Sequence, residues 1–157
     1  MTVRLSTALR TNLAGATGFA ATFANGIIEI RTGAQPATAD SAATGTLLGT
    51  VTLASGEFTP GTATNGLTFA TAADGVVSKS GVWSFNGINA PTATTAGWFR
   101  LKGNAVDNGT DDSVAKASPR LDGSIAVSGG DMNLSNVSIL NGAPTTIDSF
   151  TWTQPAV

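Results

Sequence analysis

Apolar residues in the first part of the chain recur at a helical spacing. Residues four positions apart lie on one face of a helix, and two groups of residues here keep that spacing. They are Leu5, Leu9 and Leu13, followed by Phe19 and Phe23. Glycines at positions 15 and 18 weaken the pattern between the two groups. The spacing predicts two short helices at 4–14 and 18–24, within a helical N-terminal segment over residues 1–25.

After Asn25-Gly26 the pattern changes to short runs rich in β-branched and aromatic residues. The runs lie at 27–31, 46–53, 56–58, 67–69, 76–85, 95–102, 123–127, 133–140 and 145–153. Turn residues separate them at short intervals, which is typical of an all-β fold. We therefore expect one domain over residues 1–157. Residues 26–157 are predicted to form an antiparallel β-sandwich, jelly-roll-like and of about eight strands.

Two segments carry no periodicity and are predicted to be loops, at 34–45 and 103–119. The second is polar and rich in turn residues, so we expect it to be exposed. Exposed loops on a rigid scaffold commonly carry recognition. These two loops are therefore the predicted contact surfaces of the protein.

Composition excludes several classes of chemistry. The chain has no cysteine and no histidine, which rules out a thiol nucleophile, a disulfide framework, a Cys/His zinc site and a catalytic triad with histidine. Charged residues make up 11% of the chain and the net charge is −2, so the basic surface that nucleic acid requires is missing. No run of residues approaches the ~20 apolar positions of a membrane span, and no secretion signal is evident. We expect neither nucleic acid nor a membrane as a partner.

Two arrangements retain catalytic potential without histidine. Glu29 and Glu57 are the two glutamates of the chain, and a glycosidase needs just two carboxylates. Ser78-Lys79-Ser80 holds the residue types of a Ser-Lys pair. Carboxylates on strands more often face solvent or protect sheet edges, and polar turns are more often solvated than catalytic. The sequence therefore favours a protein that is not an enzyme, with no catalytic and no cofactor-binding residues.

One acidic stretch resembles part of a calcium loop. Residues 107–112 read Asp107-Asn108-Gly109-Thr110-Asp111-Asp112, and clustered oxygen ligands in a flexible loop are what Ca²⁺ prefers. The order of ligands in an EF-hand is not met, and no glutamate closes the loop. Turns rich in Asp and Asn are common without metal. We therefore predict no metal site, and no cofactor.

The three tryptophans allow two interpretations. Trp83, Trp98 and Trp152 could stack on a sugar, but each lies in a predicted strand beside other apolar residues. Core packing is the usual fate of such large aromatic side chains. Tryptophan is also enriched at subunit interfaces. We expect core packing, with a subunit interface as the second interpretation.

Short segments spread over nearly the whole chain share one likeness. They are the opening segment with Leu5, Leu9 and Leu13, then 25–30, 32–37, 44–48, 75–80, 96–100, 122–124, 131–135 and 147–150. In these segments the chain resembles a family of small structural (virion) proteins of tailed bacteriophages and prophages, whose members mostly have undefined functions. None of the segments is a catalytic motif. The resemblance implies a component of a phage particle.

The resemblance and the missing catalytic motifs predict a capsid decoration (cement) protein that stabilises the head. We expect a homo-oligomer, a trimer, whose partners are its own copies and the major capsid protein or other virion proteins. It would be made in the host cytoplasm and located in the virion. Sparse charge agrees with this, because charged residues are depleted at the cores of interfaces. The alternatives are a tail, neck or collar component, and a carbohydrate-binding β-sandwich used in host attachment.

Overall fold

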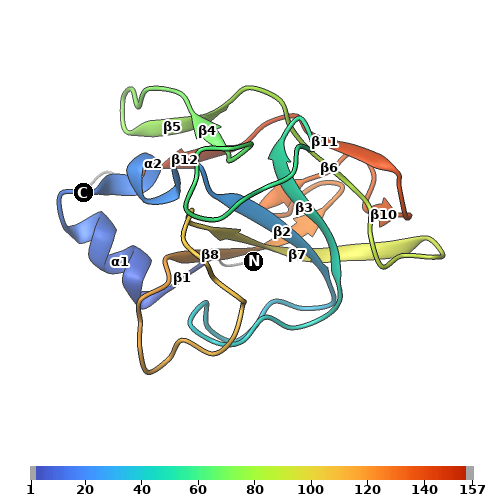
Figure 1. Cartoon of the computed structure of the whole chain (residues 1–157), viewed down its shortest axis with the longest axis horizontal. Coiled ribbons are helices and arrows are strands. Elements are labelled where there is room, and N and C mark those ends of the chain that lie inside the picture. Colours follow the sequence, from blue (N-terminus) through green and yellow to red (C-terminus); the bar gives the residue numbers. More distant parts are fainter. Residues whose placement is uncertain (1–2, 155–157) are drawn as a thin grey trace.

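The protein is a mainly β-structure with two short helices near its N-terminus (Figure 1). The structure is a computed structural model and describes residues 3–154. The ends of the predicted domain, at 1–2 and 155–157, lie outside the described residues. Mainly β-structure in antiparallel sheets, after a short helical segment, was the expectation from the sequence and is confirmed.

The named elements divide by length. The helices are α1 (Thr7–Ala14) and α2 (Gly18–Phe23). Eight strands have three or more residues: β2 (Ile27–Thr32), β3 (Leu47–Leu53), β5 (Val76–Ser80), β6 (Trp83–Asn86), β7 (Thr94–Lys102), β8 (Arg120–Ala126), β11 (Pro144–Ile147) and β12 (Thr151–Thr153). Four have two: β1 (Arg4–Leu5), β4 (Thr68–Phe69), β9 (Met132–Asn133) and β10 (Ser138–Ile139). A two-residue strand shows no alternation, so its sequence does not mark it.

The strands form one large and one small sheet. The large sheet has nine strands, with the order β1-β8-β7-β2-β3-β6-β11, and with β10 paired to β7 and β9 paired to β8. The small sheet has the order β12-β5-β4. The strand pairs are antiparallel except for β8 and β9, which are parallel. Long antiparallel pairings of β8, β7, β2 and β3 make the centre of the large sheet rigid.

The N-terminal segment differs from the predicted helix over 4–14. Arg4 and Leu5 form β1 and pair with β8, and α1 begins only at Thr7. The cause is Ser6, whose backbone is extended and whose hydroxyl accepts the backbone N–H of Leu9 at 3.2 Å. This is an N-cap bond, which fixes where a helix starts. Leu9 is fully buried, as its position on the predicted apolar face requires.

One face of the central sheet is apolar. Its neighbouring residues, taken across the strands, are Val51, Ile28, Leu101 and Leu121 in one row and Gly49, Ile30, Phe99 and Gly123 in the next. The two glycines leave room for rings: a Cβ on Gly49 would lie 2.1 Å from the ring of Phe85, and one on Gly123 would lie 2.6 Å from that of Phe99. Aromatic side chains therefore fill the space that these glycines leave open.

An aromatic layer joins the small sheet and α2 to this core. Phe19 of α2 stacks on Trp152 of β12 with ring centroids 4.8 Å apart. Phe69 of β4 meets Trp83 of β6 edge-on at 5.3 Å, and Phe150 lies at the same distance from Trp83. Contacts of this kind add to the burial of apolar surface. The small sheet is thus attached to the large one through rings.

Several predicted strands are wrong in their bounds. The run 133–140 is divided into β9 and β10, which pair with β8 and β7, and the strand expected at 123–127 begins at Arg120. The run 76–85 is divided at Gly81 into β5 and β6, which belong to different sheets. The run 145–153 is divided in the same way, because residues 148–150 leave the large sheet after β11 and the chain enters the small sheet as β12. Residues 56–58 lie in an irregular loop and not in a strand. A hydrophobic run marks extended chain but does not tell which sheet it joins.

Candidate functional site

The other face of the central sheet is charged. Successive side chains of a strand point to opposite faces, and the residues between the apolar positions of β2, β7 and β8 are mostly charged. One row across four strands consists of Arg4, Asp122, Arg100 and Glu29. The charge alternates in sign along this row. Each carboxylate therefore has a cation beside it on a neighbouring strand.

The centre of this row is a fully buried ion pair. Arg100 donates from Nε and Nη2 to the two carboxylate oxygens of Asp122, each at 2.7 Å, and both side chains are 0% exposed. The guanidinium of Arg100 also lies 5.4 Å from the ring centroid of Trp98, a favourable cation–π position. Burial raises the pKa of Asp122, although the hydrogen bonds from Arg100 act against it.

Glu29 occupies the next position of the row, and its carboxylate pairs with two cationic side chains. Its carboxylate accepts from Lys102 Nζ at 2.7 Å and from Arg31 Nε at 3.0 Å. Glu57, the second glutamate of the predicted pair, is exposed and lies in the loop after β3. The carboxylate of Glu29 is thus saturated by cations on a covered sheet face. The two glutamates sit in different environments, unlike the facing carboxylates of a glycosidase.

A loop over residues 33–46, which contains the predicted loop 34–45, covers the charged face. Its backbone carbonyls accept hydrogen bonds from four arginines. Arg4 donates to Gln35 and Pro36, Arg31 to Gly45 at 3.2 Å, Arg100 to Ser41 at 3.1 Å, and Arg120 to Asp40 and Ser41 at 3.5 Å. The planar, always charged guanidinium suits such multiple contacts. A segment without secondary structure is thereby held in one conformation.

The second predicted loop, over residues 103–119, is fixed by a buried pair at its base. Arg120 donates from Nη2 and Nε to the carboxylate of Asp107 at 2.6 and 2.7 Å. Burial acts to raise the pKa of Asp107, but hydrogen bonds from Arg120 and from the backbone N–H of Gly109 outweigh it and hold that pKa below its usual value. The same hydrogen bond raises the pKa of Arg120 against its burial. Both shifts favour the charged forms of the pair.

The two loops are joined to each other. The backbone N–H of Ala43 donates to Gly109 O, and that of Asp112 donates to Asp40 O, each at 2.8 Å. The Asp40 side chain in turn accepts from the backbone N–H of Thr7, at the start of α1, at 3.0 Å. Together, residues 33–46 and 103–119 form one unit on the charged face, here named the loop lobe, in the lower part of Figure 1.

The acidic stretch of the lobe is used for hydrogen bonds within the protein. Asp107 holds Arg120, Asp111 accepts from the backbone N–H of Ser113 at 2.9 Å, and Asp112 accepts from that of Ser118 at 2.8 Å. The bond from Ser113 also lowers the pKa of Asp111. Within residues 3–154 no three Asp or Glu side chains are placed to hold a metal ion together.

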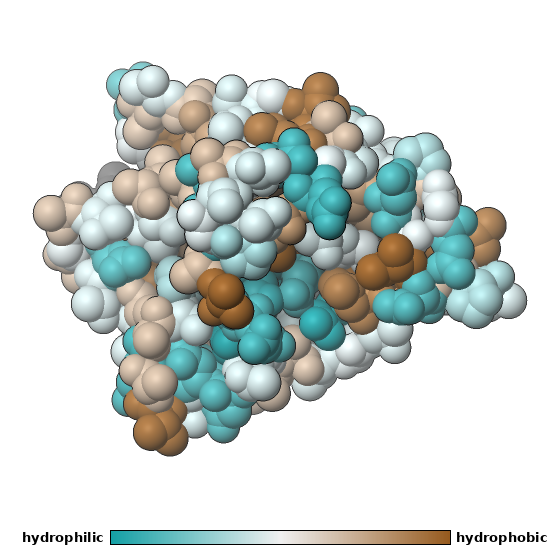
Figure 2. All heavy atoms as spheres, viewed as in Figure 1, coloured by the Kyte–Doolittle hydropathy of each residue, from teal (hydrophilic) through white to brown (hydrophobic). Residues whose placement is uncertain are grey.

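The outer surface of the lobe carries isolated apolar side chains. Val106 is 72% exposed and Val114 is 94% exposed. Figure 2 shows brown apolar patches here, set among teal polar ones, and not one continuous apolar area. Covering such a side chain would stabilise a complex by about 1.5 kcal/mol or more.

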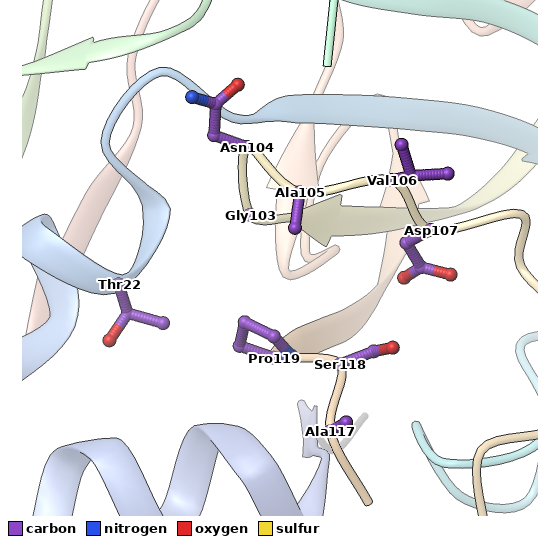
Figure 3. Close-up of a pocket in the computed structure, with 9 residues that line it drawn as sticks. All are labelled: Thr22, Gly103, Asn104, Ala105, Val106, Asp107, Ala117, Ser118 and Pro119. Atoms are coloured by element: carbon purple, nitrogen blue, oxygen red, sulfur yellow. The ribbon is translucent and has the colours of Figure 1, made fainter. Parts of the chain in front are cut away.

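A shallow hollow of about 300 Å³ lies between the lobe and the helices (Figure 3). Figure 3 shows Thr22 of α2 on one side, Pro119 and Ser118 below, and Ala105 to Asp107 on the other side. Two polar side chains here are already engaged, since Thr22 donates to Gly18 O at 2.6 Å and Asp107 is held by Arg120. The buried Oδ1 of Asn104 accepts no hydrogen bond within the described residues. The amide of Asn104 points away from the hollow. The hollow therefore lacks the converging polar groups that orient a small ligand.

The Ser-Lys candidate does not form a catalytic pair. Ser78, Lys79 and Ser80 lie in β5 and not in the predicted turn, so the lysine points to the face opposite both serines. The ammonium of Lys79 donates to Gly81 O at 3.0 Å. A serine nucleophile needs its base within hydrogen-bond reach, and neighbours on a strand do not supply that geometry.

Burial is confirmed for Trp83 and Trp98, which are both 0% exposed. Trp83 lies in the apolar core, and Trp98 lies on the charged face beside Arg100. Their indole N–H groups donate to the backbone carbonyls of Ser80 at 3.0 Å and Thr32 at 3.2 Å. Trp152 is half-buried, with one ring face covered by Phe19. A sugar-binding platform needs an open ring face, and two of the three tryptophans offer none.

The charged face and the arginine contacts are the features that sequence reasoning missed. A signal was present: three strands carry charged residues two positions apart, as Glu29 and Arg31, Arg100 and Lys102, and Arg120 and Asp122. Two-residue spacing places both charges of a strand on one face. Three such strands in a chain with few charges indicate that these faces meet.

Comparisons of this chain with protein-family models, with curated proteins and with solved structures found no match. Among the helices of residues 3–154, none is long and apolar enough to cross a membrane.

Proposed function

We propose that the protein is a structural subunit of a bacteriophage particle, most simply a capsid decoration protein that stabilises the head. The observation that carries the proposal is the loop lobe: irregular loops, anchored by buried ion pairs, present Val106 and Val114 to solvent. Exposed loops on a rigid scaffold commonly carry recognition, and Val106 and Val114 are apolar side chains that this lobe offers to a partner. The resemblance to phage structural proteins supplies the kind of particle.

The anchoring favours binding because it orders the loops in advance. Loops that become ordered on binding lose affinity to the cost of that ordering. Here Arg100, Arg120 and Arg4 hold the lobe before any partner arrives. Buried ion pairs add little net stability, but they select one arrangement, since unpairing a buried charge is costly. The charged face is suited to presenting a fixed surface.

The distribution of charge supports a role in subunit packing. Of eight basic and ten acidic residues, six are buried. They are Glu29, Arg100, Lys102, Asp112, Arg120 and Asp122. The surface is consequently even poorer in charge than the composition indicates. Interface cores are depleted in charge in the same way, so contact with copies of this chain, as a trimer, and with the major capsid protein is part of the proposal.

Two alternative functions remain: another position on the phage particle, and binding of a carbohydrate. A tail, neck or collar component would use the loop lobe in the same way, and the position on the particle separates it from a head protein. A carbohydrate-binding module for host attachment is less well supported, because Trp83 and Trp98 are fully buried.

The finer description of the fold is also a proposal. We regard the small sheet and the large sheet as the two layers of a β-sandwich, because the rings of Phe69, Trp83 and Phe150 pack between them. A jelly-roll winding is the most specific form of this proposal. Alignment of strand directions with a solved decoration protein would test it.

The test is binding to particles that lack the protein. Light scattering gives the oligomer mass, and cosedimentation with separated heads and tails gives the location. We expect a trimer that binds heads, and at least about tenfold weaker binding after Val106→Asp together with Val114→Asp, as for loss of interface anchors. Val82→Asp is the matched control, since Val82 is 57% exposed in the turn between β5 and β6. A monomer that binds neither heads nor tails would refute the proposal.

A further inference from the structure

The chain contains five asparagines that are followed directly by glycine. They are Asn25, Asn65, Asn86, Asn108 and Asn141. Such a pair is open to spontaneous chemistry, because glycine has no Cβ to hinder the approach of its backbone nitrogen to the preceding side chain. Whether the reaction occurs in the folded protein depends on how each pair is held.

The reaction needs no partner other than water. The backbone nitrogen of the glycine loses its proton and bonds to Cγ of the asparagine, and the bond from Cγ to Nδ2 breaks, so that ammonia leaves and a succinimide ring forms. Water then opens the ring to aspartate or isoaspartate. The glycine N–H must therefore be released from its hydrogen bond, and the asparagine amide must be free to turn toward it.

Four of the five pairs are held in the body of the fold. The glycine N–H groups at positions 26, 87 and 142 donate to backbone carbonyls at 3.0, 3.0 and 2.8 Å. Asn65 donates from Nδ2 to Glu57 O at 2.8 Å, and Asn141 accepts from the backbone N–H of Ala90 at 2.6 Å. Glycines 26, 66 and 87 are also packed so closely that a Cβ would lie 2.1 to 2.3 Å from backbone atoms. These contacts oppose the backbone rotation that ring closure requires.

The pair at Asn108 is held differently. Asn108 is exposed, and in the part of the chain that the structure describes its amide makes no hydrogen bond. The N–H of Gly109 donates to a side chain, Asp107 Oδ1, at 2.8 Å. Gly109 has a positive φ of 70° within an irregular loop. The carbonyl of Gly109 accepts from the N–H of Ala43, but its own N–H is held by one side chain, whereas the N–H groups of most of the other glycines donate to backbone carbonyls.

We propose that Asn108 is a site of spontaneous deamidation, and that the ion pair of Asp107 with Arg120 controls its rate. The carboxylate of Asp107 keeps the proton on the Gly109 nitrogen, because removal of a proton beside an anion is unfavourable. Arg120 fixes that carboxylate with two hydrogen bonds. Opening of the loop base releases the nitrogen and the free amide together.

The product changes the loop lobe. Aspartate at position 108 adds a negative charge between Val106 and Val114, and isoaspartate adds a backbone carbon as well. This inference does not rest on the proposed function, because the chemistry needs only the geometry at positions 107–109. If the lobe is an interface, binding would weaken as the protein ages and the modified fraction grows.

The experiment follows all five pairs in the full chain by mass spectrometry during incubation at mildly alkaline pH. Trypsin releases residues 103–116 as one peptide, and its fragment masses separate Asn108 from Asn104. We expect Asn108 to react first of the five. The variant Asn108→Gln should remove the change at this position. An earlier reaction at any other pair would overturn the proposal.

The control by Asp107 is tested with two variants of the same loop. Asp107→Ala removes the acceptor of the Gly109 N–H, and the rate at Asn108 should rise at least about tenfold, as for loss of a hydrogen bond to a charged group. Asp111→Ala is the matched control, since Asp111 bonds Ser113 and not Gly109. Equal deamidation rates at Asn108 in the two variants would show that Asp107 does not slow the reaction at this site. Equal acceleration at all five Asn-Gly pairs would show the same.

Discussion

The central sheet presents two faces built by the same strands, and they are covered in different ways. On one face Ile28, Ile30 and Phe99 meet helices, rings and the small sheet, and apolar contact of any suitable shape would serve there. On the other face Glu29, Arg100 and Asp122 meet two loops without secondary structure. Apolar packing stabilises without fixing direction, whereas ion pairs fix direction with little net gain. The first face makes the fold stable, and the second gives the loops one shape.

The largest loss of stability is expected from a charge placed in the apolar core. Leu9→Asp places a carboxylate at a position that is 0% exposed and has apolar neighbours. The cost should exceed about 4 kcal/mol of unfolding free energy, because an unpaired charge is buried. Denaturant unfolding measures it. An unchanged unfolding midpoint and oligomer mass would show that α1 is not part of the core.

The next largest effect is expected at the centre of the charged face. Asp122→Ala leaves the guanidinium of Arg100 buried without its carboxylate, which should cost about 3–5 kcal/mol. The double variant Arg100→Met with Asp122→Leu removes both charges and should recover most of that loss. Equal unfolding free energies for the single and the double variant would contradict the view that this face depends on pairing.

A smaller and local effect is expected at the base of the second loop. Arg120→Lys keeps the charge but loses one of the two hydrogen bonds to Asp107, at a cost of about 1–2 kcal/mol. Hydrogen exchange should rise in residues 103–119 and stay unchanged in β7. The matched control is Arg10→Lys at an exposed position of α1, expected within about 0.5 kcal/mol of the parent. Faster exchange throughout the sheet would show that Arg120 stabilises the whole fold and not only the loop at 103–119.

The smallest expected effect is the dependence of stability on pH. Because the folded pKa of Asp107 lies below its usual 3.8, its contribution to stability is present above that value and is lost as the pH falls through the folded pKa. Burial raises the pKa of Asp122, so its contribution has the opposite sign and falls as the pH rises. Acid should therefore loosen residues 103–119 while the sheet stays protected, as hydrogen exchange can show. Asp107→Asn should reduce this acid response, and the remainder should come from Asp111, whose pKa is also lowered by its bond with Ser113.

The spacing of apolar residues along the chain predicts the class of the fold and the core residues. It does not predict the charged face. Leu9, Phe19 and Phe23 are buried as their spacing predicts, because helical periodicity is a local property. The cap at Ser6 moves the helix start, and this depends on a single hydroxyl. Arg100 and Asp122 become partners only through the order and register of the strands, which alternation within one strand does not contain. The predicted loops at 34–45 and 103–119 are confirmed as irregular, but their anchoring follows from that same long-range register.

The pairing of β1 with β8 has a consequence for how the protein folds as it is synthesised. Arg120 donates its backbone N–H to Ser6 Oγ across 114 residues, and Asp122 lies beside both Arg4 and Arg100. Until β8 leaves the ribosome, the first strand has no place in the sheet, β7 has an open edge, and the arginines lack a carboxylate partner. Contacts between distant residues slow folding, and open strand edges favour aggregation. A chain released early, before residue 122, would lack the strand that joins its beginning to the sheet and would be a target for chaperones and proteases.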